Sequence, residues 1–192
     1  RGIGWYRKHL SLDDRLKGKR RFLHFEGANQ VATVYVNGAF AGAHKGGYTA
    51  FTVDITKLAR FDDAGSENVI AVEVNNAHDP FIPPLSVGYA LYGGIYRDVW
   101  LVATDSVHVT MADHGGPGVY VSTPSLTKDE GVVAVRGTIA NDGATAKQLR
   151  VVSTLLDSSA TAVAQASAIV AVNAQREATW SQTLPALRRP RL

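Results

Sequence analysis

Residues 83–101 read PPLSVGYALYGGIYRDVWL, and this stretch decides the fold. Adjacent prolines stiffen its start, and the pair Gly93-Gly94 lets the backbone turn sharply before the apolar run 99–102. A continuous apolar run is typical of a strand covered on both sides. The irregular segment 76–94, which precedes this apolar run, is long and carries aromatic residues. These features indicate an ordered loop with a function.

The rest of the first hundred residues alternates between apolar and polar side chains, as half-buried strands do. Val34 and Val36 precede Asn37-Gly38, a pair whose tolerance of positive φ angles predicts a tight hairpin. One helical turn is expected at Lys57-Leu58, where the residue Asp54 or Thr56 can cap the free amides. The same alternation predicts two further strand faces, formed by Phe51, Val53 and Ile55 and by Ile70, Val72 and Val74.

After Thr104 aromatic residues almost disappear, and alanine, valine, threonine and serine dominate. Short strands at even spacing without a helical stripe suggest a small β-sandwich of the immunoglobulin type. The turn sequences Asn141-Asp142-Gly143 and Asp157-Ser158-Ser159 separate some of them. The expected strands are 118–122, 132–140, 149–156, 162–172 and 177–184.

Four blocks in the first hundred residues carry a resemblance to a known family. They occur in the order Gly4–Lys8, then Val34–Gly38 with Gly46–Phe51, then Asn68–Asn76 ahead of His78-Asp79, and last the stretch 83–101. Together they resemble the sugar-binding domain that opens family 2 glycoside hydrolases, a family that contains β-galactosidases, β-glucuronidases and β-mannosidases.

The resemblance implies an all-β fold. Residues 1–104 are expected to form a jelly-roll, galactose-binding-like β-sandwich, in whose core Trp5 and Tyr6 lie. Residues 105–192 are expected to form a smaller immunoglobulin-like β-sandwich that is truncated at its C-terminus. An architectural role is expected for the Gly93–Val99 segment, in which Arg97 can bind a carboxylate or backbone carbonyls.

The chemistry of glycoside hydrolysis is missing from this sequence. It needs two carboxyl groups about 5 to 10 Å apart, and no motif brings two of the chain's five glutamates together. The family's acid/base usually follows an asparagine directly, and no Asn-Glu pair occurs here. The resemblance places the catalytic residues in a (β/α)₈ barrel downstream. We therefore expect no catalytic residue and no activity in this chain by itself.

The resemblance also implies that the long loop reaches the mouth of that barrel. An acidic residue seven positions before Ile95 often binds substrate hydroxyls in the family, but Gly88 stands there in this chain. Aromatic rings can stack on a sugar and polar groups can orient it. The candidate substrate-binding residues are Asn76, His78, Asp79, Tyr89 and Tyr92.

Neither a metal site nor a cofactor is expected. The six histidines lack the helical spacing of zinc ligands. Ser86 lacks the Gly-x-Ser-x-Gly turn of a nucleophile, and no helix follows Gly115–Gly118 to bind a phosphate. This glycine-rich segment is interpreted as a linker between the two sandwiches.

Composition excludes other classes of protein. Hydrophobic residues make up 45% and charged residues 19%, as in globular proteins. No apolar run reaches the ~20 residues of a membrane span. The basic clusters 15–21 and 188–191 contain no interleaved aromatic residues to stack bases, so no nucleic-acid partner is expected. They are interpreted as a solvated turn and an exposed tail.

The absence of cysteine is compatible with the cytoplasm and with a bacterial periplasm. A periplasmic or secreted location is favoured, and the start at Arg1 indicates that an N-terminal piece has been removed.

Two functions from different classes remain open. The leading hypothesis is a non-catalytic N-terminal part of a β-galactosidase-like family 2 enzyme. Its partners would be the catalytic barrel of the same polypeptide and, in the complete enzyme, a carbohydrate substrate. The alternative is a free-standing, lectin-like carbohydrate-binding module. The sequence does not define the sugar, the linkage or the oligomeric state.

Overall fold

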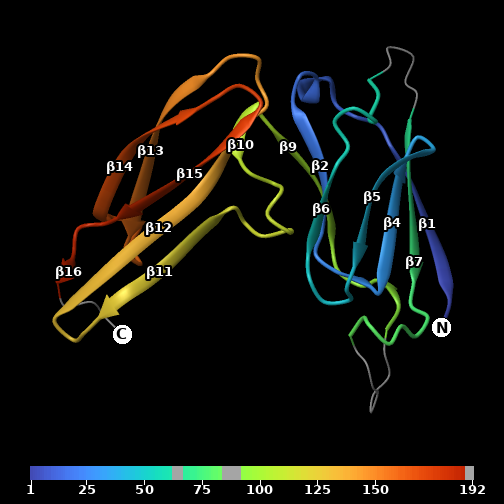
Figure 1. Ribbon diagram of the computed structural model, residues 1–192, viewed down its shortest axis with the longest axis horizontal. Helices are drawn as coiled ribbons and strands as arrows, with labels where there is room; N and C mark the ends of the chain where they lie inside the picture. The colour runs from blue at the N-terminus through green and yellow to red at the C-terminus, as the bar shows by residue number, and fades with distance from the viewer. Residues whose placement is uncertain (62–66, 84–91, 189–192) are drawn as a thin grey trace. The chain divides into compact units, whose positions relative to one another are not determined.

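The computed structural model describes residues 1–61, 67–83 and 92–188, and its regular structure is almost entirely β-strand (Figure 1). Within these residues the helical element is a 3₁₀ turn, η1 (Asp14–Leu16). The predicted all-β class is confirmed. No helix among the described residues is long and apolar enough to cross a membrane.

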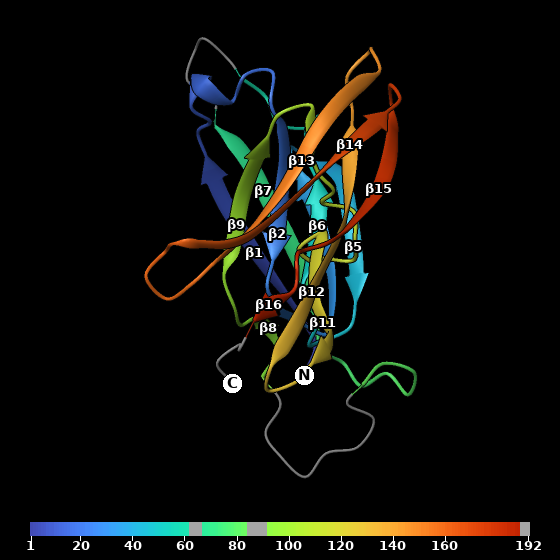
Figure 2. The ribbon, with the colours of Figure 1, turned by 90° about the vertical axis from the view of Figure 1, so that its left-hand side faces the viewer.

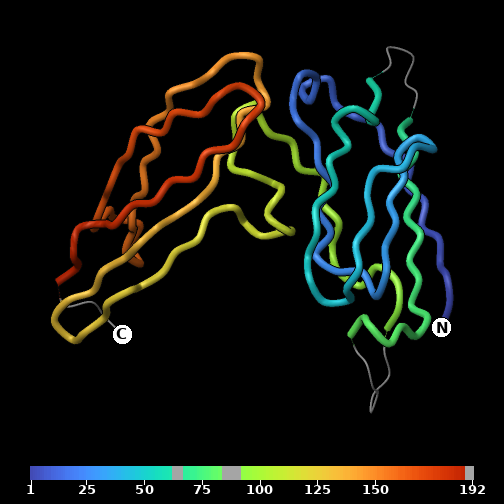
Figure 3. The backbone as a smooth tube through the Cα atoms, in the orientation of Figure 1, coloured from blue at the N-terminus to red at the C-terminus, as the bar shows by residue number. Residues whose placement is uncertain are grey.

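Contacts between residues divide the chain into two compact units. Unit 1 consists of Arg1–Asp105 and Met111–Gly116, and unit 2 consists of Ser106–Thr110 and the chain from Pro117 onward. The backbone trace in Figure 3 follows the crossing segment Met111–Gly116 from unit 2 back to unit 1 and out again.

Unit 1 is built from two antiparallel sheets, whose strands lie side by side in Figure 1. The larger sheet has the spatial order β1 (Ile3–Leu10), β7 (Asn68–Asn75), β4 (Val31–Val36) and β5 (Ala39–Lys45). The smaller sheet has the order β6 (Phe51–Asp54), β2 (Arg20–Phe25) and β9 (Val99–Thr104). A short pair joins β3 (Ala28–Asn29) to β8 (Gly94–Ile95).

The core of unit 1 lies between these sheets. Strand β7 alternates strictly between buried and half-buried residues, because successive side chains of a strand point to opposite faces. Phe25 and Phe51 stack face to face with ring centroids 4.5 Å apart. The hairpin after β4 has positive φ at both Asn37 and Gly38. The predicted strand faces and the predicted turn are therefore confirmed.

Two predictions about strand burial are wrong. Trp5 was expected in the core, yet it is 60% exposed, and Tyr6 beside it is also exposed. Trp100 of β9, expected in a strand covered on both faces, is 53% exposed. The strand registers give the reason: Trp5 lies opposite Glu73 and Trp100 lies opposite His24, so both side chains are on the outer faces of their sheets, away from the core.

Two polar segments also differ from expectation. The expected helical turn after β6 is a hydrogen-bonded turn in which Leu58 N donates to Ile55 O. Its start is capped as predicted, because Asp54 Oδ1 accepts from Thr56 N at 2.8 Å. In the basic cluster 15–21, Arg21 is buried and donates to the carbonyls of Leu16 and Thr56. This arginine is therefore structural rather than solvated.

Unit 2 is a second β-sandwich. Strand β12 (Glu130–Asn141) pairs with β10 (Val107–Val109), β11 (Val119–Leu126), β15 (Arg176–Thr183) and β16 (Leu187–Arg188). The other layer is the pair β13 (Lys147–Leu156) and β14 (Ala162–Val172), seen side by side in Figure 2. The five strands predicted for this half are thus all present.

The core of unit 2 contains a buried amide. Asn141 is fully buried at the end of β12 and donates to the carbonyls of Thr145 and Val172. Its Oδ1 accepts from Gly143 N at 3.0 Å. The turn sequence recognised at residues 141–143 therefore also ties β12 to β14.

The segment Met111–Gly116 packs on unit 1. Gly115 has a φ of +78°, and a Cβ at this position would lie 2.4 Å from the carbonyl oxygen of Ala50. From the sequence, this segment was expected in the second domain, residues 105–192. We therefore propose a division in which both sandwiches stand as expected and Met111–Gly116 belongs to the first.

Candidate functional site

The residue Asn76 lies at the end of β7 and anchors one side of the long loop. Its backbone N–H donates to Gly2 O at 3.0 Å, and its Oδ1 accepts from Gly2 N at 2.8 Å. A Cβ on Gly93 would lie 2.2 Å from Asn76 Nδ2. Glycine at 93 therefore allows the outgoing end of the loop to lie directly against this amide.

The second glycine makes room for a tyrosine of β1. Gly94 has a φ of +89°, and a Cβ there would lie 2.0 Å from the hydroxyl of Tyr6. That hydroxyl accepts a hydrogen bond from Ile95 N at 3.3 Å. The expected structural role of the glycine pair has a specific form: both positions fit closely against side chains that are distant in the sequence.

Two buried amide side chains, for which no role was predicted, form hydrogen bonds to the backbone of the loop. Asn29 Nδ2 donates to the carbonyl of Tyr92, and Gln30 Nε2 donates to Ile82 O at 2.8 Å. Asn29 and Gln30 are both buried. Asn29 Oδ1 is buried without a hydrogen-bond partner among the described residues. No local sequence motif marks these two residues, because their partners lie more than fifty positions away.

The five predicted site residues have different surroundings. The Tyr92 side chain is 80% exposed beside the glycine pair, close in sequence to the Gly93 that contacts Asn76. His78 is exposed. The carboxylate of Asp79 accepts from Phe81 N at 2.8 Å, so it closes a turn of the loop. Tyr89 lies outside the described residues, as does Gly88.

A shallow polar hollow of about 400 Å³ lies beside Asn76 and the glycine pair. It brings Asn76 together with the chain start and the glycine pair, whereas His78, Asp79 and Tyr92 do not line it. The amide of Asn76 and the phenol hydroxyl of Tyr6, which both line the hollow, can donate hydrogen bonds to a polyol and accept them from it. The lining residues are Arg1, Gly2, Ile3, Gly4, Tyr6, Val74, Asn76, Gly93 and Gly94.

Arg97 does not make the predicted contact within the described chain. Its guanidinium lies over the ring of Tyr96, 5.8 Å from the centroid, and neither a carboxylate nor a carbonyl partner is found for it among residues 1–61, 67–83 and 92–188. Tyr96 in turn donates its hydroxyl to Gly47 O. The strand entry is therefore held by the tyrosine.

The structure brings no two glutamates together among its described parts. In unit 1, Glu26 accepts from Trp100 Nε1 at 2.9 Å, and Glu67 pairs with His9 at 2.9 Å. Glu73 lies on the half-buried face of β7. In unit 2, Glu177 accepts from Thr110 Oγ1, and Glu130 begins β12. Each glutamate carboxylate thus has a local setting of its own.

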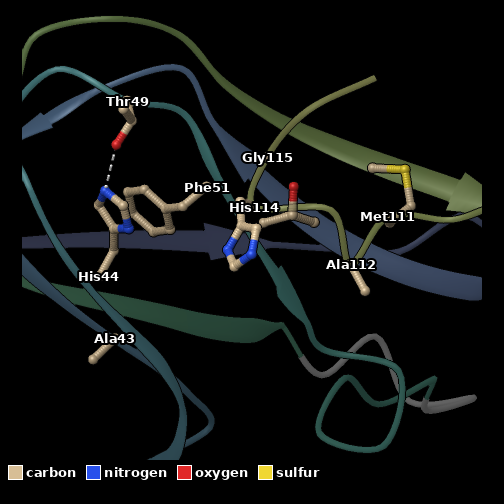
Figure 4. A pocket seen from close by; sticks show the side chains of 9 residues that line it. Ala43, His44, Thr49, Phe51, Met111, Ala112, His114 and Gly115 are labelled. Atoms are coloured by element: carbon tan, nitrogen blue, oxygen red, sulfur yellow. Dashed lines mark hydrogen bonds between the residues drawn. The ribbon is translucent and has the colours of Figure 1, made fainter. Parts of the chain in front are cut away.

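A second pocket of about 410 Å³ lies where Met111–Gly116 packs on unit 1 (Figure 4). His44 stacks on Phe51 at 4.5 Å between centroids and hydrogen-bonds Thr49 Oγ1 at 3.1 Å. His114 lines the same pocket. No group of three or more histidine, aspartate or glutamate side chains among the described residues could hold a metal ion.

The burial of His44 gives a testable dependence on pH. Burial lowers the pKa of His44 below its usual value of about 6.5. Below pH 6.5 the unfolded chain therefore binds a proton that the folded chain binds less readily. The free energy of unfolding should consequently fall as the pH drops from about 6.5 through the lowered pKa.

We expect this slope to flatten in His44→Gln. The measurement is the urea midpoint at several values between pH 7 and pH 5 for both proteins. Comparing slopes removes the constant cost of the lost ring contact with Phe51. Parallel slopes would show that His44 is not the titrating group.

Comparison with known proteins adds the family. Residues 1–105 match the sequence model of "Glycosyl hydrolases family 2, sugar binding domain". The chain belongs to glycosyl hydrolase family 2. This family 2 chain is 43% identical over 142 residues to a β-galactosidase of Thermoanaerobacter pseudethanolicus, with 73% of the chain covered. It is 40% identical over 144 residues to a β-glucuronidase of Bacteroides fragilis, with 75% covered.

Solved structures agree with this family 2 assignment. The chain matches Bacteroides uniformis β-glucuronidase 2, covalently bound to cyclophellitol-6-carboxylate aziridine, with a TM-score of 0.94 and 34% identity. The match covers 100% of this chain and 22% of that one. The chain spans 18% of the β-galactosidase and 20% of the Bacteroides fragilis β-glucuronidase named above.

Proposed function

We propose that this chain is a non-catalytic, N-terminal part of a longer family 2 glycoside hydrolase that cleaves β-galactosides. The observation that carries the proposal is the match of all of this chain to 22% of a β-glucuronidase. The 43% identity to a β-galactosidase favours that substrate class. The bond-breaking carboxylates would belong to a barrel domain elsewhere in the polypeptide.

In this proposal the loop contributes one wall of the active site. The anchors at Asn29, Gln30 and Asn76 hold both ends of the loop against the sandwich. Exposed side chains of the loop, above all Tyr92 and His78, are then free to meet a sugar bound in the barrel. Because these hydrogen bonds already order the ends of the loop, the loop loses little conformational entropy when substrate binds. Its contacts with substrate therefore contribute more fully to affinity.

The test replaces loop side chains in the longer enzyme. We expect Tyr92→Ala and His78→Ala each to lower kcat/KM for a nitrophenyl β-galactoside by about tenfold, or about 1.4 kcal/mol. The thermal midpoint should stay within about 1 °C, because exposed side chains contribute little to stability.

Phe40→Ala is the matched control. Phe40 is also an exposed aromatic residue of unit 1, but it pairs with Tyr35 across the hairpin at the other end of β4 from the loop. Its removal should leave kcat/KM unchanged. Equal kinetic effects of all three substitutions, or none in any of them, would contradict a substrate-bordering role of the loop.

A further inference from the structure

The outer face of the larger sheet of unit 1 carries exposed aromatic side chains. Trp5 is 60% exposed and Phe40 is 62% exposed. The half-buried Tyr35 contacts both, with its ring centroid 6.0 Å from that of Trp5 and 6.1 Å from that of Phe40. Tyr35 alternates with the buried residues Val34 and Val36, so its ring points away from the core. Contiguous exposed apolar surface that is rimmed by polar groups marks a binding site.

Trp5 and Tyr35 are the rings that can offer their faces to one ligand. The angle between their planes is 30°, whereas Phe40 meets Tyr35 edge to face at 74° and packs against it. Strand β7 lies between β1 and β4, and its residue opposite Tyr35 is Ala71. Because an alanine side chain fills little of the space above the sheet, the two rings can lean over β7 and meet.

Polar groups lie among these rings. Glu73 is directly opposite Trp5 on one side and Thr33 on the other. Within residues 1–61, 67–83 and 92–188, no hydrogen-bond or ion-pair partner is found for the Glu73 carboxylate, the Tyr35 hydroxyl or the Trp5 indole N–H. The carboxylate can only accept hydrogen bonds, whereas the indole only donates them and the hydroxyl does both. This face therefore combines aromatic surface with both a free acceptor and free donors.

The chemistry of a neutral sugar chain matches this combination. Each pyranose ring has apolar C–H faces that can lie on aromatic rings, and hydroxyls at its rim that can donate to Glu73 and accept from Trp5. A nucleic acid fits poorly, because the carboxylate repels phosphate groups. A flat apolar protein surface also fits poorly, because it would bury the carboxylate without a partner, at a cost in free energy.

We propose that Trp5, Tyr35 and Glu73 bind a neutral chain of β-linked pyranose sugars on the outer face of the larger sheet. A β-linked chain is extended, so successive sugar units can lie along one sheet face and contact both rings. None of these three residues lines the polar hollow beside Asn76. The inference therefore does not rest on the proposed function, in which other side chains border an active site.

NMR spectra of the indole N–H groups of residues 1–192 test the proposal. The sequence contains three tryptophans, Trp5, Trp100 and Trp180, so the variants Trp5→Phe and Trp100→Phe assign all three signals. Titration with cellohexaose or a β-linked galactohexaose to about 10 mM should shift the Trp5 signal and saturate it. The signals of Trp100 and Trp180 should stay in place. No shift of the Trp5 signal with either hexasaccharide would overturn the inference.

Variants give an independent measurement by calorimetry. Trp5→Ala and Tyr35→Ala should each weaken binding of the hexasaccharide at least about tenfold. Trp100→Ala is the matched control, because Trp100 is also an exposed tryptophan, 53% accessible, but lies on the outer face of the smaller sheet. Its removal should leave the affinity unchanged. Equal weakening by the substitutions of Trp5 and Trp100 would contradict a site at Trp5.

Two further outcomes identify other occupants. Binding that Tyr92→Ala abolishes and Trp5→Ala leaves intact would place the sugar at the loop, which would overturn this inference and support the proposed role of the loop. A Trp5 signal that shifts with protein concentration in the absence of sugar would identify a second copy of the chain as the occupant of this face, and would overturn the inference as well.

Discussion

Phe25→Ala should lower the free energy of unfolding of unit 1 by about 4 kcal/mol. Phe25 is 1% exposed and stacks on Phe51 at 4.5 Å, which in turn stacks on His44 at 4.5 Å. The change removes a whole ring from between the sheets. Strands on both sides are tied by long ladders, so the space cannot collapse readily and a cavity remains.

Urea unfolding followed by tryptophan fluorescence measures this effect, because Trp5 and Trp100 both lie in unit 1. Phe81→Ala is the matched control: the side chain is 90% exposed, and its loss should change the free energy by no more than about 0.5 kcal/mol. A loss below about 1 kcal/mol for Phe25→Ala would show that the two-sheet core does not depend on this ring stack.

Gly115→Ala should destabilise unit 1 by about 3 kcal/mol. Part of the cost is backbone strain, because Gly115 has a φ of +78°. The rest is steric: the added Cβ would lie 2.4 Å from the carbonyl oxygen of Ala50 and 2.7 Å from the amide of Phe51. Both are backbone atoms at the start of β6, which cannot move aside as a flexible side chain can.

Gly18→Ala separates the two contributions. Gly18 has nearly the same φ, +77°, but nothing lies within 4 Å of its added Cβ. This control should therefore cost only about 1 to 2 kcal/mol, the strain alone. Urea midpoints of the two variants measure the difference. Equal losses would show that Met111–Gly116 does not pack against Ala50.

The strands that sequence alone predicts best are those whose two faces have different surroundings. Ile70, Val72 and Val74 all lie in the core because they share the face of β7 that packs against the other sheet. The prediction failed at Trp5 and Trp100, which lie opposite Glu73 and His24 on the outer faces of their sheets. An apolar residue does not show which face of its strand is covered, since that depends on how distant strands pair and pack.

The candidate site was only partly accessible from sequence. The glycine pair marked the end of the loop, and the structure shows why glycine is needed there, with Asn76 and Tyr6 in close contact. The buried anchors Asn29 and Gln30 were missed because an amide becomes recognisable as an anchor only when its distant carbonyl partner is known. The roles of His78 and Tyr92 toward a sugar stay a prediction, since their exposed side chains lack a described partner that would define them.

We propose that this family 2 chain supplies no catalytic group of its own. The most direct measurement is the hydrolysis of nitrophenyl β-galactoside and β-glucuronide by highly purified residues 1–192. We predict no turnover above buffer background, because both an acid and a nucleophile or base are needed, and the five glutamates have separate settings. Turnover that a single Glu or Asp substitution abolishes would show that residues 1–192 do carry a catalytic group.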